Sequence, residues 1–237
     1  MVYHWMEKSR PLYFCLTDGS GGSGSSRIAS TARVMETTGA TAGAVYGRYT
    51  DKEVYRLLLE GRVDVFVALA RELAAALEGG GVADVAGDAL EGFNPTHDVC
   101  RLLIDGAVAE VRRRTGRAVR NYDFVLDGPP DTCPEGSRAG ALRLDLDEAA
   151  LERKLAAALA YPEMRSEVET AVQRFGSHAY AVECLRPAAT GSMIARFEAE
   201  PPAYERSGEI RVGEGRYRDV IRYREHVEPV RAALEAG

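Results

Sequence analysis

The chain has 237 residues, a formal net charge of −6 and a hydrophobic fraction of 46%. This length buries a core without disulfide or metal staples, and the acidic balance argues against nucleic acid, because a phosphate-binding face usually makes a domain basic. No run approaches the roughly 18 apolar residues of a membrane helix. Four separated cysteines without a C-x-x-C motif indicate reduced thiols. We therefore expect a cytoplasmic protein that binds a small-molecule substrate, without nucleic-acid or membrane partners, and compatible with a homo-oligomer.

The first half of the chain alternates strand and helix patterns. In chain order, the sequence predicts a strand at 12–16, a helix at 27–39, a strand at 42–47, helices at 52–61 and 63–79, a short buried strand at 82–87 and a helix at 97–115. Parallel strands need such crossovers. The expected fold is therefore α/β, with a Rossmann-like, mainly parallel sheet flanked by helices. Ligands bind beyond the carboxyl ends of such strands, so loops 17–26 and 86–97 are expected to face one pocket.

The pattern changes beyond residue 120. A Pro/Gly-rich connector at 128–140 precedes a strand and a long helix, broken at Tyr161-Pro162, and then another strand at 179–188. The tail predicts a hairpin around the sequence GEG at 213–215, followed by a helix. These signals divide the chain into a core at 1–127 and a C-terminal α+β extension at 128–237.

The loop after the first strand contains a literal G-x-G-x-x-G, formed by Gly19, Gly21 and Gly24. A nucleotide- or S-adenosylmethionine-binding enzyme is one interpretation, since such loops present N–H groups to phosphates. That fold also requires an acid at the end of the second strand, and the nearest candidate, Asp51, is better explained as a helix cap. A solvated connector without a ligand is the other interpretation.

Three segments, taken in order, point to a different chemistry. LTDG at 16–19 is followed by Arg27 at a helix start, ADVAGDALEGFNPTHD occupies 83–98, and KLAAALAY occupies 154–161. Together they resemble the PIG-L/LmbE-like zinc-dependent deacetylases over most of residues 12–161. The resemblance implies hydrolysis of an N-acetyl group on an amino sugar or a sugar-bearing metabolite. It implies the following site: zinc ligand His97; catalytic residues Asn94, near the oxyanion, and Asp98; substrate-binding residues Asp18, Gly19 and Arg27.

The chain departs from this family at one important place. The H-P-D-D strand that supplies two zinc ligands and the general base has no counterpart here, and His4 is expected to be a surface histidine. Catalytic zinc usually needs three protein ligands, so this chain is expected to bind zinc weakly or not at all. Two explanations stay open: a preceding segment carries the missing strand, or the protein is a binding module that has lost metal chemistry.

Overall fold

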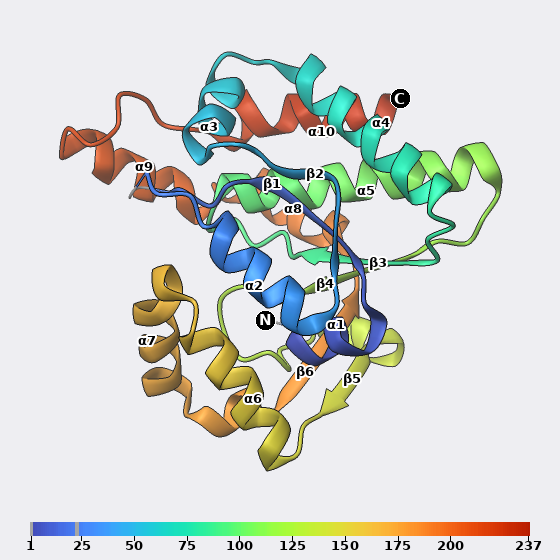
Figure 1. Cartoon of the computed structure of the whole chain (residues 1–237). Coiled ribbons are helices and arrows are strands. Elements are labelled where there is room, and N and C mark those ends of the chain that lie inside the picture. The colour runs from blue at the N-terminus through green and yellow to red at the C-terminus, as the bar shows by residue number, and fades with distance from the viewer. Residues whose placement is uncertain (1, 22–23) are drawn as a thin grey trace. The chain divides into compact units, whose positions relative to one another are not determined.

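The computed structural model describes residues 2–21 and 24–237, so Gly22 and Ser23 of the predicted glycine loop lie outside it. The chain forms two compact units, each built from two segments: unit 1 comprises 1–50 and 123–187, and unit 2 comprises 51–122 and 188–237. In Figure 1, unit 1 joins the blue segment to the yellow one, and unit 2 joins the turquoise and green segment to the red one. Whether residues 1–127 and 128–237 fold as domains stays a prediction.

Unit 1 contains three short 3₁₀ turns besides its helices and strands. Its elements are α1 (Tyr3–Ser9), β1 (Leu12–Thr17), α2 (Ile28–Thr38), β2 (Thr41–Tyr49), η1 (Glu135–Gly140), β5 (Leu142–Asp145), α6 (Glu148–Leu159), η2 (Pro162–Met164), α7 (Arg165–Phe175), η3 (Ser177–Tyr180) and β6 (Val182–Pro187).

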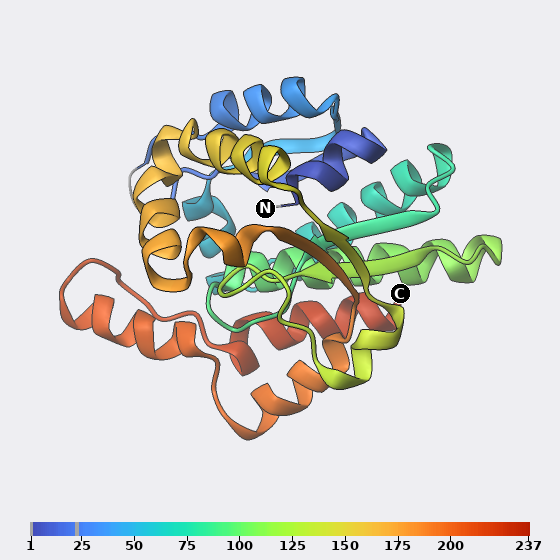
Figure 2. The ribbon, with the colours of Figure 1, turned by 90° about the horizontal axis from the view of Figure 1, so that it is seen from below.

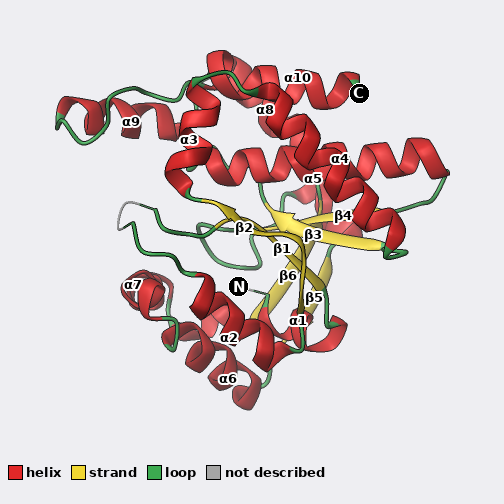
Figure 3. Ribbon diagram, turned by 45° about the horizontal axis from the view of Figure 1, so that its top comes forward, coloured by secondary structure: helices red, strands yellow, loops and turns green. Residues whose placement is uncertain are grey.

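The β1 and β2 strands run parallel and lie side by side (Figure 3), with α2 as their crossover. The pairing register shifts between Cys15 and Thr17, whose partners are Tyr46 and Tyr49, so β2 carries an extra residue there. β5 and β6 pair in the antiparallel sense. Helix α1 packs against α2 and α6 within the same unit.

A buried polar cluster fixes α1 in unit 1. The Glu183 carboxylate accepts N–H hydrogen bonds from His4 at 3.1 Å and Trp5 at 3.0 Å, and lies 3.4 Å from Nζ of Lys154. His4 is 5% exposed and its Nε2 lies 2.8 Å from the carbonyl oxygen of Ala150. The expectation of a surface histidine was therefore wrong, because packing against distant elements buries it.

Unit 2 is mainly helical. Its elements are α3 (Asp51–Leu59), α4 (Val63–Gly79), β3 (Asp84–Asp88), α5 (Pro95–Thr115), the first residues of β4 (Arg120–Phe124), α8 (Thr190–Ala199), α9 (Ala203–Gly213), the π-helical turn η4 (Tyr223–Val227) and α10 (Glu228–Ala236).

The core of unit 2 lies between α4 and α5, which run side by side in turquoise and light green in Figure 2. Apolar residues recur on the facing sides of both helices, as an amphipathic pattern requires. The cluster consists of Ala74, Leu77, Ala107, Val108, Val111 and Val119. Helix α10 packs on both α4 and α5, although it comes from the far end of the sequence.

The structure confirms a mixed α/β fold, and its strands form two small sheets. The Rossmann-like, mainly parallel arrangement stays a prediction. One is the parallel β1–β2 pair, and the other has the order β3-β4-β6-β5 and includes an antiparallel pair. The hairpin expected around residues 213–215 is wrong, because residues 203–213 form helix α9. All four cysteines are thiols. No helix in residues 2–21 and 24–237 is both long and apolar enough to cross a lipid bilayer.

Candidate functional site

The candidate loop, residues 88–98, runs from the end of β3 through the first turn of α5. It carries three of the predicted site residues and belongs to unit 2. Asn94 has an extended backbone and its side chain accepts the N–H of Thr96 at 2.9 Å, which makes it the N-cap of α5. Pro95 follows at the first helical position, where its missing N–H costs nothing. The cap therefore starts α5 at Pro95, two residues before the predicted start, and places His97 and Asp98 in its first turn.

His97 forms a close pair with Asp88, the last residue of β3. Its Nδ1 lies 2.7 Å from Oδ2 of Asp88, and its side chain is 41% exposed. Burial lowers the pKa of His97, but the hydrogen bond and the charge of Asp88 outweigh burial and raise it above its ordinary value of 6.5. With the Nδ1 hydrogen donated to Asp88, Nε2 of His97 carries the lone pair that can accept a proton or bind a metal.

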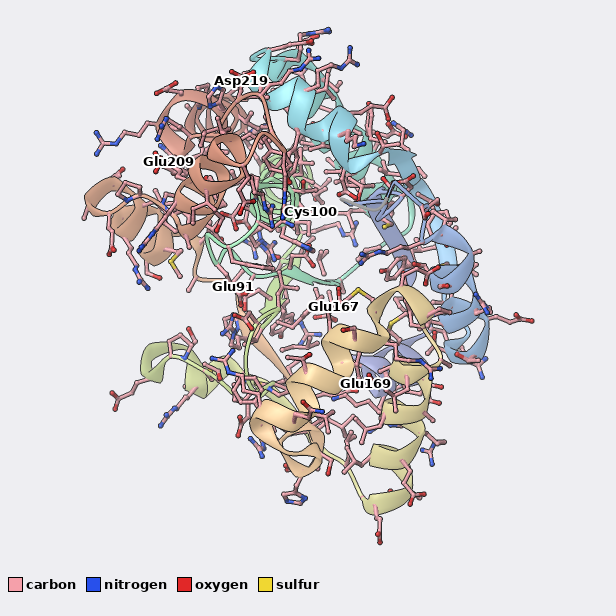
Figure 4. The ribbon with its side chains drawn as sticks, turned by 90° about the vertical axis from the view of Figure 1, so that its left-hand side faces the viewer. Glu91, Cys100, Glu167, Glu169, Glu209 and Asp219 are labelled. Carbon is pink, nitrogen blue, oxygen red and sulfur yellow. The ribbon has the colours of Figure 1, made fainter. Side chains whose placement is uncertain are left out.

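Asp98 is only 1% exposed, and its side chain binds the backbone of the loop. Its Oδ1 accepts N–H hydrogen bonds from Glu91 and Gly92, both at 3.2 Å. Burial raises the pKa of Asp98 to about 7, even though these two bonds and the charge of His97 act in the opposite direction. Figure 4 labels Glu91 on this loop and Cys100 on α5.

Tyr204 in α9 contacts the same loop at Gly92. Its N–H donates to the carbonyl oxygen of Gly92 at 3.0 Å, and its phenol is buried near Asp98. Burial first, and then the charge of Asp98, raise the pKa of Tyr204. Within the described part of the chain, neither Oη of Tyr204 nor Oδ2 of Asp98 has a hydrogen-bond partner.

Arg101 lies one helical turn after His97 and is completely buried. Its guanidinium forms an ion pair with Asp105 at 2.8 Å and donates to Oδ1 of Asn121 at 2.7 Å and to the carbonyl oxygen of Tyr122 at 3.0 Å. A buried charge is stable only when paired and hydrogen-bonded in this way. The network joins α5 to β4, and Nη1 of Arg101 also donates to the carbonyl oxygen of Asp88 at 3.5 Å.

The glycine loop of unit 1 folds on itself. Asp18 accepts the N–H of Ser20 at 2.9 Å, which forms an Asx turn. Gly19 donates to Thr17 and Gly24 to Ser20, so these N–H groups are engaged within the loop. Such contacts leave fewer donors for a phosphate among the described residues of the loop.

Arg27 lies against the backbone of Gly19. A Cβ atom at Gly19 would be 3.1 Å from the Arg27 side chain, which explains a glycine at that position. The guanidinium donates to Sδ of Met164 at 2.8 Å, and Tyr161 donates to the Arg27 carbonyl oxygen. Among the described residues, Nε of Arg27 has no partner.

The predicted site residues thus form two groups. Asn94, His97 and Asp98 share one loop of unit 2, while Asp18, Gly19 and Arg27 share one loop of unit 1. The common pocket stays a prediction. Sequence reasoning missed Asp88 and Arg101 as partners, although the polar spacing of His97, Arg101 and Asp105 on an apolar helix was a signal for Arg101.

The donor set does not fit a zinc site. Three ligands are the usual minimum for catalytic zinc, and residues 2–21 and 24–237 contain no group of three or more histidine, cysteine or acidic side chains arranged to hold a metal. His97 has the carboxylate partner on Nδ1 that metal-ligating histidines usually have. His97 supplies one such ligand.

Comparison of the chain with protein-family models, with curated proteins and with solved structures gives no significant match.

Proposed function

We propose that the candidate loop, residues 88–98, is the reactive site of a cytoplasmic amide hydrolase, which removes the acetyl group from an N-acetylated amino sugar or sugar-bearing metabolite. The observation that carries the chemistry is the pairing of His97 with Asp88 at 2.7 Å, with the imidazole partly open to solvent. The substrate class comes from the sequence resemblance of residues 12–161.

His97 acts as the general base in this proposal. Nε2 takes a proton from a water molecule, and the resulting hydroxide adds to the amide carbonyl carbon. Asp88 accepts a hydrogen bond from Nδ1–H of His97 and stabilises the imidazolium that forms. When the C–N bond breaks, the same imidazolium returns its proton to the amine, so the products are acetate and the free amino sugar.

Two neighbours support this reaction. The Oδ1 atom of Asn94 is occupied by the Thr96 N–H, which leaves the Nδ2 group to donate to the oxyanion. Asp98 is a positioning residue, because its buried carboxylate holds the backbone of Glu91 and Gly92.

Acetate release from N-acetylglucosamine by the purified full chain, measured between pH 6 and 9, tests the proposal. The rate should rise with pH as His97 loses its proton. His97→Gln should lower kcat by about a hundredfold or more, the usual contribution of a general base, and Asp88→Asn by roughly ten- to a hundredfold. His178→Gln, at an exposed histidine, is the control and should leave the rate unchanged.

Two results would contradict the proposal. One is the absence of acetate release from any N-acetylated sugar. The other is release that depends on added zinc and survives His97→Gln, because the activity would then come from another site.

A further inference from the structure

Phe93 is an aromatic residue in an unusual setting. Among the described residues, the large hydrophobic side chains with high exposure are Leu12, Phe93 and Ile210, and Phe93 is the aromatic one at 51%. Single exposed apolar residues are common and need no explanation. Phe93 differs because its ring lies nearly parallel to the His97 ring, with an interplanar angle of 18° and centroids 6.3 Å apart.

The backbone holds Phe93 outside the core. Gly92 has a φ of +72°, and a Cβ atom there would lie 2.7 Å from the ring of Phe197, so the chain passes close to the core at this residue. Tyr204 and Asp98 bind its carbonyl and N–H groups. On the other side, Asn94 is fixed as the N-cap of α5. Phe93 therefore lies between Gly92 and Asn94, which are both held by hydrogen bonds. The backbone of the loop keeps its side chain exposed.

A carboxylate lies against the imidazole beside Phe93. Oδ2 of Asp88 is 2.7 Å from Nδ1 of His97, so the polar group nearest to this imidazole is an acid. A phosphorylated or otherwise anionic ligand would be repelled at such a position. A neutral ring, or a ring that carries an ammonium group, would be accepted.

We propose that Phe93 is the surface on which the apolar face of a hexosamine ring stacks, beside the reactive Nε2 of His97. The proposal rests on the function proposed above and names the binding residue of that same site. The face of an aromatic ring carries partial negative charge and attracts the C–H groups on one side of a pyranose. The ligand is an uncharged N-acetylated hexosamine, or its amine product, and not a sugar phosphate.

Saturation-transfer NMR on the full chain tests this directly, with N-acetylglucosamine and its 6-phosphate as probes. Ring protons of the unphosphorylated sugar should be saturated. Phe93→Ala should weaken its affinity by roughly three- to tenfold, the range expected for one aromatic contact, and Phe93→Leu should weaken it as well. Phe93→Trp should retain binding. Ile210→Ala, at an exposed residue of the same unit, is the matched control.

The outcomes separate this inference from the proposed function. Sugar binding that depends on Phe93, without acetate release, would support the stacking surface and contradict the hydrolase. Acetate release with the same KM in the wild type and in Phe93→Ala would support the hydrolase and contradict the stacking surface. Equal binding of the 6-phosphate, or no sugar binding at all, would overturn the inference.

Discussion

Two carboxylates of the candidate loop have different tasks because their surroundings differ. Asp88 is partly exposed and faces His97, where its charge raises the pKa of the imidazole. Asp98 is buried and binds two backbone N–H groups, and burial raises its own pKa to about 7. One acid therefore acts on the reactive histidine, while the other holds the loop.

The raised pKa of Asp98 predicts a pH dependence of stability. Between its ordinary value of 3.8 and about 7, the folded state holds a proton that the unfolded state has lost. The free energy of unfolding must then fall as the pH rises through this window. Asp98→Asn, which cannot titrate, should make the decline between pH 4 and 7 shallower in urea titrations.

The control for this experiment is Glu60→Gln, at an exposed acid of the same unit. Its stability should follow the wild-type curve across the same pH range. Parallel curves for wild type and Asp98→Asn would show that Asp98 is ionised in the folded protein throughout.

Single residues also mark the limit of the sequence analysis. The position of Asn94 before Pro95 and an apolar helix made its capping role predictable from local chemistry. The burial of Arg101 was not predictable, because its partners Asn121 and Tyr122 come from β4, which was not recognised as a strand. The same holds for Glu183, whose contacts with His4 and Lys154 join distant segments.

At the scale of elements, strong periodic patterns were predicted well. Helix α4 occupies 63–79 as expected, and the break at Tyr161-Pro162 separates α6 from α7. Figure 4 shows Glu167 and Glu169 on α7.

The prediction of a hairpin in the C-terminal tail was wrong because the sequence pattern there is ambiguous. Residues 203–213 have little helical periodicity, and the sequence GEG at 213–215 indicated the turn of a hairpin. The Arg222 side chain binds both Glu205 and Glu209, at 3.2 and 3.0 Å. Acids four residues apart lie on one side of a helix, so this tertiary contact favours α9 over a strand.

The parallel β1–β2 pair depends on Gly47, at the extra residue of β2. Its φ is +58°, and a Cβ atom there would lie 2.4 Å from Cδ1 of Ile28 in α2. Gly47→Ala should therefore lower the free energy of unfolding by about 2–4 kcal/mol, from backbone strain together with overpacking. Chemical denaturation monitored by circular dichroism measures this.

Gly61→Ala separates the two causes. Gly61 has a similar φ of +64°, but no atom lies within 4 Å of the position of its Cβ. It should lose only about 1–2 kcal/mol, the cost of the left-handed conformation. Equal losses at both glycines would show that Ile28 moves away without cost.

At the scale of the whole molecule, each compact unit is assembled from segments far apart in the chain. The sequence pattern divides the chain at a Pro/Gly-rich connector, whereas the contacts join the last helix to α4 and α5. Local periodicity carries no information about which distant helix covers an apolar face. That pairing depends on shape, as where the Cβ position of Gly106 in α5 is only 3.3 Å from Leu234 in α10.

This assembly predicts that a substitution near the C-terminus loosens helices early in the chain. Val230 in α10 is 1% exposed, so Val230→Asp would place an unpaired charge in the core of unit 2. Hydrogen exchange of the full chain should then accelerate in α4 and α5, since their protection depends on the buried contacts of α10. Ala232→Asp, at an exposed position of the same helix, adds the same charge without burying it and should leave both helices protected. Unchanged exchange in α4 and α5 of the Val230→Asp protein would mean that α10 does not belong to their core.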